Sequence, residues 1–383
     1  MGCAHGNLFD GLERTIATDG NIHFLPLGCT RTPVETGSRI IVHRSATNGP
    51  ATSHMIAGIM PANGFVHAAV PKTTPMKEFD MMQLILALCA LLLASTVAAD
   101  PLPMQEAAPG VYVHHGVHEE LDEGYHGDIC NIGFIVGKTG VAVIDSGGSL
   151  QVGKRLREAV RKVTDLPIRY VVNTHIHPDH IFGNAAFKED RPVYVGHAKL
   201  ADAMERRRDI YLRNNAAWLG EAFAGSEIIK PTQAVETAMQ LDLGERALLL
   251  TAYPAAHTNT DLTVFDTASA TLWSGDLLFI ERTPSIDGDV KGWLKVIAQL
   301  RAIKAQRVIP GHGPVTGDWQ AALDKEQHYF DTLLGDIRAS IKQGATMEQA
   351  MNTAAASEKG NWVLFENVNR RNINIVYPVL EWD

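Results

Sequence analysis

HIHPDH, the stretch at residues 175–180, follows directly after a short apolar run that predicts a strand. Alternate side chains, His175 and His177, can converge on one metal ion, while Asp179 and His180 turn toward a second. Imidazole and carboxylate groups are suitable zinc ligands. Without a metal, these groups would crowd partly buried, chargeable side chains at one strand end, which is costly unless each is paired. The stretch therefore predicts a metal site.

Three further candidates lie where later predicted strands end, each beside small residues. They are His257 after YPAA, Asp276 in SGD and His312 in PGHG. Ligands at such positions are held by a rigid scaffold and still reach open space. A single histidine or aspartate in a loop is weak evidence, because such a residue is usually only solvated. Their order along the chain and their contexts together favour one shared metal site.

Strand-like and helix-like segments alternate from Asp100 onward in two β-rich halves, which predicts a layered α/β fold. A hairpin is expected around the turn at 137–140, and Ser149 is expected to cap a helix that ends near Val163. The expected strands are Val111–Val113, Asn131–Val136, Val141–Ile144, Ile168–Val172, Val193–Val195, Ala247–Ala252, Leu262–Phe265, Thr271–Trp273 and Arg307–Ile309. Further helices are expected over Ala198–Ala224, Trp293–Ile303 and Trp319–Lys342.

The composition is typical of a soluble globular protein, with 45% hydrophobic and 20% charged residues. The net charge of -9 favours solubility and argues against a nucleic-acid partner. The short basic run Arg206–Arg208 is flanked by acidic residues and predicts a solvated helix face. The four cysteines lack C-x-x-C spacing, and only Cys130 lies beyond residue 99. With no cysteine near the metal motifs and no G-x-S-x-G segment, no protein nucleophile is expected.

An apolar run at Met82–Val97 ends in small residues, which is the pattern of a signal peptide. It is short for a transmembrane helix, and a buried core helix is the alternative. Residues 1–75 show no sustained periodicity, as expected for a disordered extension or for a start codon assigned too far upstream. We thus expect an extension at 1–75, a signal-like segment at 76–99 and the catalytic domain at 100–383. Such a protein would be periplasmic or secreted, with no stable membrane anchor after cleavage.

The metal motifs resemble those of the metallo-β-lactamase superfamily over roughly Val111–Asp331, which implies a four-layered αββα sandwich with metals at one edge. Asp145, in VAVIDSG, matches the early Asp-x-Gly motif of the family and is expected to organise the loops near the site, with a plain turn aspartate as the alternative. The expected cofactor is two zinc ions, with iron and manganese as alternatives. The resemblance implies that the first metal is bound by His175, His177 and His257, the second by Asp179, His180 and His312, and both by Asp276.

Within the superfamily, Asp276 favours a ligand set like that of glyoxalase II, because true zinc β-lactamases usually lack a bridging aspartate at this point. The basic motif with which glyoxalase II holds glutathione has no clear counterpart, and Arg370 and Arg371 are better read as solvated. NTHIHPDHIFGN at 173–184 is most similar to the quinoprotein relay system zinc metallohydrolases. That resemblance implies an exported protein with a contextual link to a quinoprotein dehydrogenase.

A helical insert after His197, at Ala198–Ile229, supports the same resemblance and leaves two readings open. It could cover the site and supply apolar contacts to a substrate through Tyr211, Trp218 and Phe223. It could equally pack as an ordinary core helix. His197 itself follows a predicted strand and precedes this helix, so a role at the helix start is expected.

The resemblance implies a dinuclear zinc hydrolase of a small-molecule acyl substrate, which cleaves an ester, thioester, lactone or related bond by a metal-bridging hydroxide. Asp179 is expected to orient that hydroxide or to handle protons as well as to bind metal. Two other activities stay open: a mononuclear iron oxidoreductase like the persulfide dioxygenases, and β-lactam hydrolysis. A binding protein that kept its metals without catalysis is a third possibility.

Overall fold

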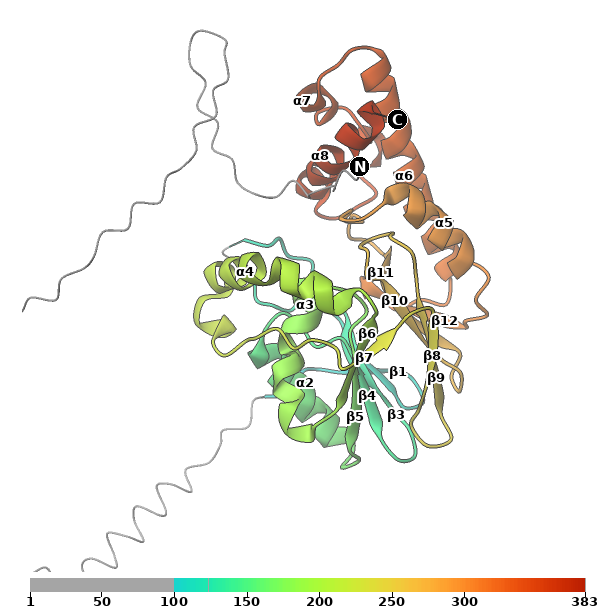
Figure 1. Ribbon diagram of the computed structural model, residues 1–383. Coiled ribbons are helices and arrows are strands. Elements are labelled where there is room, and N and C mark those ends of the chain that lie inside the picture. The colour runs from blue at the N-terminus through green and yellow to red at the C-terminus, as the bar shows by residue number, and fades with distance from the viewer. Residues whose placement is uncertain (1–99, 123, 383) are drawn as a thin grey trace, which may run out of the picture. The chain divides into compact units, whose positions relative to one another are not determined.

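The computed structural model describes residues 100–122 and 124–382 (Figure 1). The expected extension at 1–75 and the signal-like segment at 76–99 lie outside the described residues. Among the residues that are described, no helix has both the length and the apolar character needed to cross a membrane.

Two β-sheets form the centre of the domain. In the first sheet, strands β1 to β4 pair with one another in antiparallel fashion, and the pairs from β4 to β7 are parallel. In the second sheet only β11 and β12 pair in parallel. The first sheet has the order β1 (Gln105–Ala108), β2 (Val111–His114), β3 (Ile132–Val136), β4 (Val141–Ile144), β5 (Ile168–Val172), β6 (Val193–His197) and β7 (Gln233–Val235). The second has the order β12 (Arg307–His312), β11 (Thr271–Phe279), β10 (Leu262–Asp266), β9 (Ala247–Ala252) and β8 (Ala238–Asp242).

Alternating side chains of the central strands belong to different layers of the core. On β4, Val143 packs in a cluster with helix α2 (Leu150–Val163), whereas Ile144 packs between the two sheets. Both are fully buried, as expected for strands covered on both faces. On the far side of the second sheet, Leu272 and Val308 pack under α5 (Val290–Leu300) and α6 (Trp319–Lys342). The expected four-layered αββα arrangement is therefore confirmed (Figure 1).

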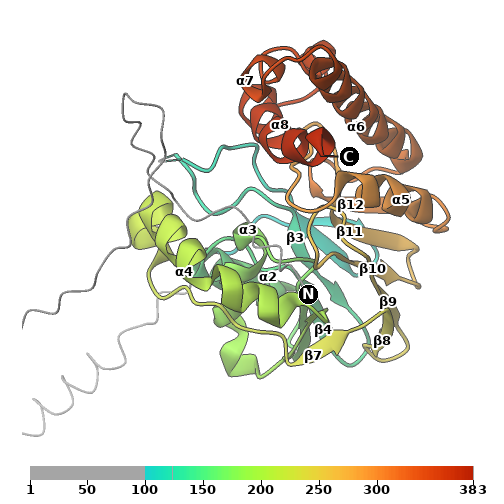
Figure 2. The same ribbon diagram turned by 45° about the horizontal axis from the view of Figure 1, so that its top comes forward.

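The remaining helices extend the two outer layers. Helices α6, α7 and α8 pack against one another beside α5 (Figure 2). The helix α8 continues through Pro378. The elements not yet introduced are α3 (Pro178–Ile181), α4 (Leu200–Leu219), α7 (Met347–Ala350), α8 (Phe365–Glu381) and the 3₁₀ helices η1 (Phe182–Asp190), η2 (Gly220–Phe223) and η3 (Ala356–Glu358).

Local sequence signals set several element boundaries. The Ser149 side chain accepts a hydrogen bond from the backbone N–H of Val152, which caps α2 as expected. The long C-terminal helix expected at Trp319–Lys342 has those bounds. Two strands run further than expected: β11 continues from Trp273 to Phe279, and β12 continues to His312. Their extensions pair with each other across two register shifts, which sequence periodicity does not reveal.

His114 makes the domain's stability depend on pH in a predictable direction. Its Nδ1 lies 2.9 Å from the carbonyl of Pro103 and its Nε2 2.8 Å from Asp128, so a protonated ring can donate both bonds. Burial is the largest single effect and lowers the pKa of His114. The bond to Asp128, the charge of Asp128 and the bond to Pro103 raise the pKa by more in total, so the net shift is upward. Its stabilising contribution is therefore complete below the unfolded pKa of about 6.5 and is lost as pH rises through the folded pKa.

Accordingly, the His114→Gln variant should lose more free energy of unfolding at about pH 6 than at about pH 9 relative to the unchanged protein. Urea unfolding at both pH values measures the difference. An equal loss at both would show that the charge on His114 does not stabilise the fold.

Candidate metal centre

The structure brings all seven candidate ligands together at one end of the two sheets. The loop after β5 carries His175 and His177, and α3 carries Asp179 and His180. His257 lies in the loop between β9 and β10. His312 is the last residue of β12 and so lies at a strand end as expected, whereas Asp276 lies within β11, which continues past the end expected for it. They form two clusters that share Asp276: it groups with His175, His177 and His257 in one and with His180 and His312 in the other, where Asp179 groups with His180 and Cys130.

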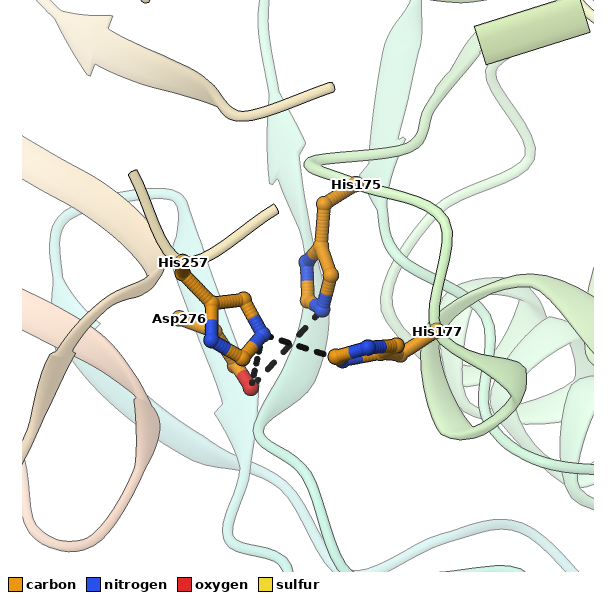
Figure 3. A group of neighbouring side chains, drawn as sticks. All are labelled: His175, His177, His257 and Asp276. Carbon is orange, nitrogen blue, oxygen red and sulfur yellow. Dashed lines mark hydrogen bonds and ion pairs between the residues drawn. The ribbon is translucent and has the colours of Figure 1, made fainter. Parts of the chain in front are cut away.

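The first cluster contains His175, His177, His257 and Asp276, whose ligand atoms lie within 4.8 Å of one another. Asp276 Oδ2 lies 3.3 Å from His257 Nε2 and 3.7 Å from His175 Nε2. His257 Nε2 also lies 2.9 Å from His177 Nδ1 (Figure 3). Two ligand atoms bound at about 2.1 Å to one tetrahedral ion lie roughly 3.4 Å apart, so these separations fit a single ion.

The second cluster contains Asp179, His180, His312 and Asp276. Asp276 Oδ1 lies 3.2 Å from His180 Nε2, and Asp276 Oδ2 lies 3.3 Å from His312 Nε2. Asp179 Oδ2 lies 3.4 Å from His180 Nε2 and 3.5 Å from His312 Nε2. Oδ1 of Asp276 thus lies near the second cluster, and Oδ2 lies near both clusters. A carboxylate in this position could be shared by two ions.

Buried polar atoms without partners supply a direct test of whether metals fit. Among the described residues, His175 Nε2, His180 Nε2 and Asp276 Oδ1 are buried and make no hydrogen bond. Unpaired buried polar atoms are costly and rare in folded proteins. All three point into the two clusters, so a bound cation would satisfy each of them. The donor set therefore fits two metal ions.

The opposite ring nitrogens are held by a second layer of hydrogen bonds. His257 Nδ1 lies 2.7 Å from the carbonyl oxygen of Ser285, and His312 Nδ1 lies 2.7 Å from that of Ile129. A carbonyl only accepts, so each Nδ1 carries the proton and each Nε2 has a free lone pair. This arrangement fixes the tautomer that binds metal.

Protonation states in the clusters also suit metal binding. Burial lowers the pKa of His257 to about 3 and holds the pKa of His175 well below its usual value, so both rings are neutral. Burial tends to raise the pKa of Asp179 and Asp276, but neighbouring imidazoles hold both below the ordinary range. Neutral imidazole and ionised carboxylate are the forms that bind a cation. His180 differs from these two rings. Burial lowers its pKa, but the neighbouring Cys130, Asp179 and Asp276 together have a larger opposite effect, so the pKa of His180 is raised well above its usual value.

Asp145 connects the two halves of the HIHPDH stretch. It has a φ of 53°, and its Oδ1 accepts from the Thr174 backbone N–H at 2.8 Å. Its Oδ2 accepts from Thr174 Oγ1 at 2.7 Å and lies 2.8 Å from His180 Nδ1. The side chain thus orients a metal-binding histidine and the strand end before it, as expected for a loop-organising residue.

Replacing Asp145 with alanine should weaken metal binding by about 10- to 100-fold, the usual effect of removing a partner that orients a ligand. Zinc affinity measured by competition with a chelator would show this change. The exposed Asp331→Ala is the matched control and should bind zinc normally. Unchanged affinity in Asp145→Ala would mean that His180 holds its orientation without the carboxylate.

Two residues that the sequence analysis missed hold His177. Its Nε2 lies 3.1 Å from Asp287 Oδ2, and Arg207 on α4 forms an ion pair with the same carboxylate. Burial tends to raise the pKa of Asp287, but the bonds from His177 and Arg207 hold it below its usual range. The expectation that Arg206–Arg208 is a solvated face is therefore wrong at its centre: Arg206 and Arg208 are exposed, but Arg207 is not.

Cys130 lies at the second cluster, which corrects the expectation that no cysteine is near the site. Its Sγ donates a hydrogen bond of 2.8 Å to the carbonyl oxygen of Asp179. Burial raises the pKa of this thiol far above its usual value. Without a metal the thiol is therefore protonated and is not a nucleophile. Its sulfur lies within 4.8 Å of the ligand atoms of Asp179 and His180, so Cys130 is a further candidate ligand at the second cluster.

The helical insert packs as a core element, one of the two readings that the sequence left open, since Tyr211 and Trp218 lie against the same buried cluster as Phe223; apolar contacts to a substrate stay a prediction. Phe223 packs edge-to-face against Phe182 in a buried cluster, which is core packing. Tyr211 on α4 also accepts a hydrogen bond from Arg207, which contacts the partner of a metal ligand. His197 Nδ1 accepts from the backbone N–H of Lys199 at 3.0 Å, so it acts at the helix start as expected.

Comparison with known proteins shows which family model and which proteins the region of this site is similar to. Residues 126–312 match the model of the Metallo-beta-lactamase superfamily. A linear primary-alkylsulfatase from Pseudomonas sp. (strain ATCC 19151) is 36% identical over 61 residues, which are 16% of this chain and 12% of that protein. The solved stereoselective inverting sec-alkylsulfatase Pisa1 from Pseudomonas sp. is similar in fold, with a TM-score of 0.56 and 15% identity over 73% of this chain and 50% of that chain. This chain thus spans only part of the length of these relatives.

Proposed function

From the premise that residues 126–312 form a metallo-beta-lactamase superfamily domain, we propose that the protein is a metal-dependent hydrolase that uses two zinc ions. The observation that carries the proposal is the position of Asp276, whose carboxylate belongs to both clusters of candidate ligands. Two ions bound there would share this carboxylate and could act together on one bond. A single ion in the first cluster would leave the ring nitrogens of His180 and His312 without a metal to bind.

When bound, two divalent ions supply Lewis acidity, which polarises the bond under attack and brings the pKa of water from 15.7 toward about 7. The protein's own groups supply orientation and proton handling. Asp179 directs Oδ2 toward both His180 and His312, so its carboxylate borders the reacting space. We assign to it the task of orienting the attacking water and holding its proton. Asp145 and Asp287 hold the histidines in place while the charge of the site changes.

The bond cleaved belongs to an ester or a related class. Acyl esters, thioesters and lactones follow from the ligand set, which resembles that of glyoxalase II. Sulfate esters enter as a second candidate because similarity extends to two proteins described as alkylsulfatases. Export from the cytoplasm and a link to a quinoprotein dehydrogenase remain predictions from the sequence.

Metal content and turnover, measured together on the purified full chain, test the proposal. Plasma mass spectrometry should find about two zinc per chain. Initial rates on a thioester, a lactone, 4-nitrophenyl acetate and 4-nitrophenyl sulfate should show hydrolysis that chelation removes and zinc restores. About one iron per chain, with oxygen uptake and no hydrolysis, would overturn the proposal in favour of an iron oxidoreductase.

A further inference from the structure

Arg282 is a buried guanidinium beside the second metal cluster. Only 6% of the residue is exposed. Its position is set by the metal ligand His312: the backbone N–H of Ile280 donates to the His312 carbonyl at 3.0 Å, and that of Arg282 donates to the Ile280 carbonyl at 2.8 Å. The short segment after β11 thus runs alongside the ligand and brings a permanent positive charge to the site.

This guanidinium differs in its partners from two arginines that are only partly buried. Arg207 and Arg246 each form an ion pair with a carboxylate. Arg282 donates from Nη1 to the carbonyl oxygen of Glu119 at 2.9 Å, and within 100–122 and 124–382 no carboxylate oxygen lies within 4.0 Å of it. A buried charge without a paired counter-ion is costly. Burial accordingly lowers the pKa of Arg282, while the charges of Asp179 and Asp276 counteract that shift, and so to a smaller extent does Glu120, which is paired with Arg371.

Metal binding removes the compensation that these two carboxylates give. Two divalent ions carry more positive charge than Asp179 and Asp276 together neutralise, and Asp287 is already paired with Arg207. The loaded site therefore has an excess of positive charge with Arg282 at its border. Such a field attracts an anion and disfavours a cation.

A second donor near Arg282 lacks a partner. The hydroxyl of Tyr125 is buried, with 3% of the residue exposed, and makes no hydrogen bond among the described residues. Burial raises the pKa of Tyr125 well above its usual value, and the charges of Asp179, His180 and Arg282 also act on its hydroxyl. The same small region thus holds a guanidinium without a carboxylate and a hydroxyl without an acceptor.

We propose that Arg282 and Tyr125 bind an oxyanion of the substrate, so that the hydrolase acts on anionic esters, in which a sulfate or carboxylate group lies next to the metal ions. The inference rests on the proposed metal-dependent hydrolysis and narrows its substrate class. A guanidinium can donate two parallel hydrogen bonds to either group, and a buried charge-assisted bond of this kind is strong. The tyrosine hydroxyl would donate a third.

Anion binding tests the proposal without turnover. The zinc-loaded full chain is titrated calorimetrically with sodium sulfate and, separately, with sodium acetate, at ionic strength held constant with sodium chloride. Sulfate or acetate affinity should fall at least about tenfold in Arg282→Gln and several-fold in Tyr125→Phe, with zinc content unchanged. Arg157→Gln, which alters a partly buried arginine paired with Asp190, should bind both anions normally.

Kinetics then identify which oxyanion the site takes. We expect Arg282→Gln to raise KM for 4-nitrophenyl sulfate or for 4-nitrophenyl hydrogen succinate, and to leave the neutral 4-nitrophenyl acetate unaffected. A higher KM for the sulfate ester would identify sulfate as the bound oxyanion, and a higher KM for the succinate ester would identify carboxylate. Arg282→Lys keeps the charge but loses the two-pronged geometry, so it should bind the anion with intermediate affinity.

Failure of this inference differs from failure of the proposed function. Equal anion affinity in the unchanged protein, Arg282→Gln and Tyr125→Phe would overturn it, even if the protein hydrolyses neutral esters. Anion binding that depends on Arg282 in a protein without any ester hydrolysis would support the anion site and contradict the hydrolase.

Discussion

Replacing Asp276 with alanine is expected to reduce zinc content from about two ions per chain to less than one and to lower ester hydrolysis by about 1000-fold or more. Its Oδ2 lies near His257 and His312, and its Oδ1 lies near His180. No other carboxylate of the described chain serves both metal clusters. Removing it takes a ligand from both ions at once, and it also removes the negative charge that offsets them.

Asp276→Asn separates these two effects. The amide keeps the size and one oxygen but loses the charge, so it should retain more zinc than alanine while hydrolysis stays low. The control is Asp318→Ala, which removes an exposed carboxylate that makes no capping bond at the start of α6. Two zinc ions and a normal rate in Asp276→Ala would rule out the shared-ligand arrangement.

The sequence could predict which candidate ligands the fold brings together, because metal chemistry limits which residue types can crowd together. HIHPDH is compact, and its spacing after a strand already places four ligands. His257 and His312 come from distant segments, but each stands beside small residues that mark a strand end. The layered fold followed from the alternation of strands and helices, since each sheet face must be covered.

Other parts of the site could not be predicted because they depend on contacts between distant segments. Asp287 lies 3.1 Å from His177 but is separated from it by 110 residues, and nothing in its local pattern marks it. Arg207 belongs to a charged run that looks solvated, and only the packing of α4 distinguishes it from its neighbours. Cys130 reaches Asp179 because the segment before β3 meets the short helix α3. Periodicity describes single elements and carries no information on such meetings.

Gly311→Ala tests how closely the backbone of β12 must approach the shared carboxylate. A Cβ at this position would lie 1.8 Å from Asp276 Oδ1, far inside any permitted contact. The oxygen cannot move away without leaving its cluster, because it lies 3.2 Å from His180 Nε2. We therefore expect Gly311→Ala to lose at least one zinc ion per chain and about 100-fold or more in hydrolysis rate, although only one methyl group is added.

Gly317→Ala is the matched control on the same stretch of chain. Its added Cβ would meet only the carbonyl oxygen of Gln306, at 3.5 Å, so stability should change by no more than about 1 kcal/mol and zinc content should not change. Metal analysis and thermal unfolding of both variants separate a displaced ligand from a general loss of folding. A folded Gly311→Ala with two zinc ions would show that Asp276 can bind both from another position. A folded variant with one zinc ion would instead show that the absence of a side chain at Gly311 is needed for Asp276 to serve both clusters, since the fold itself would be intact.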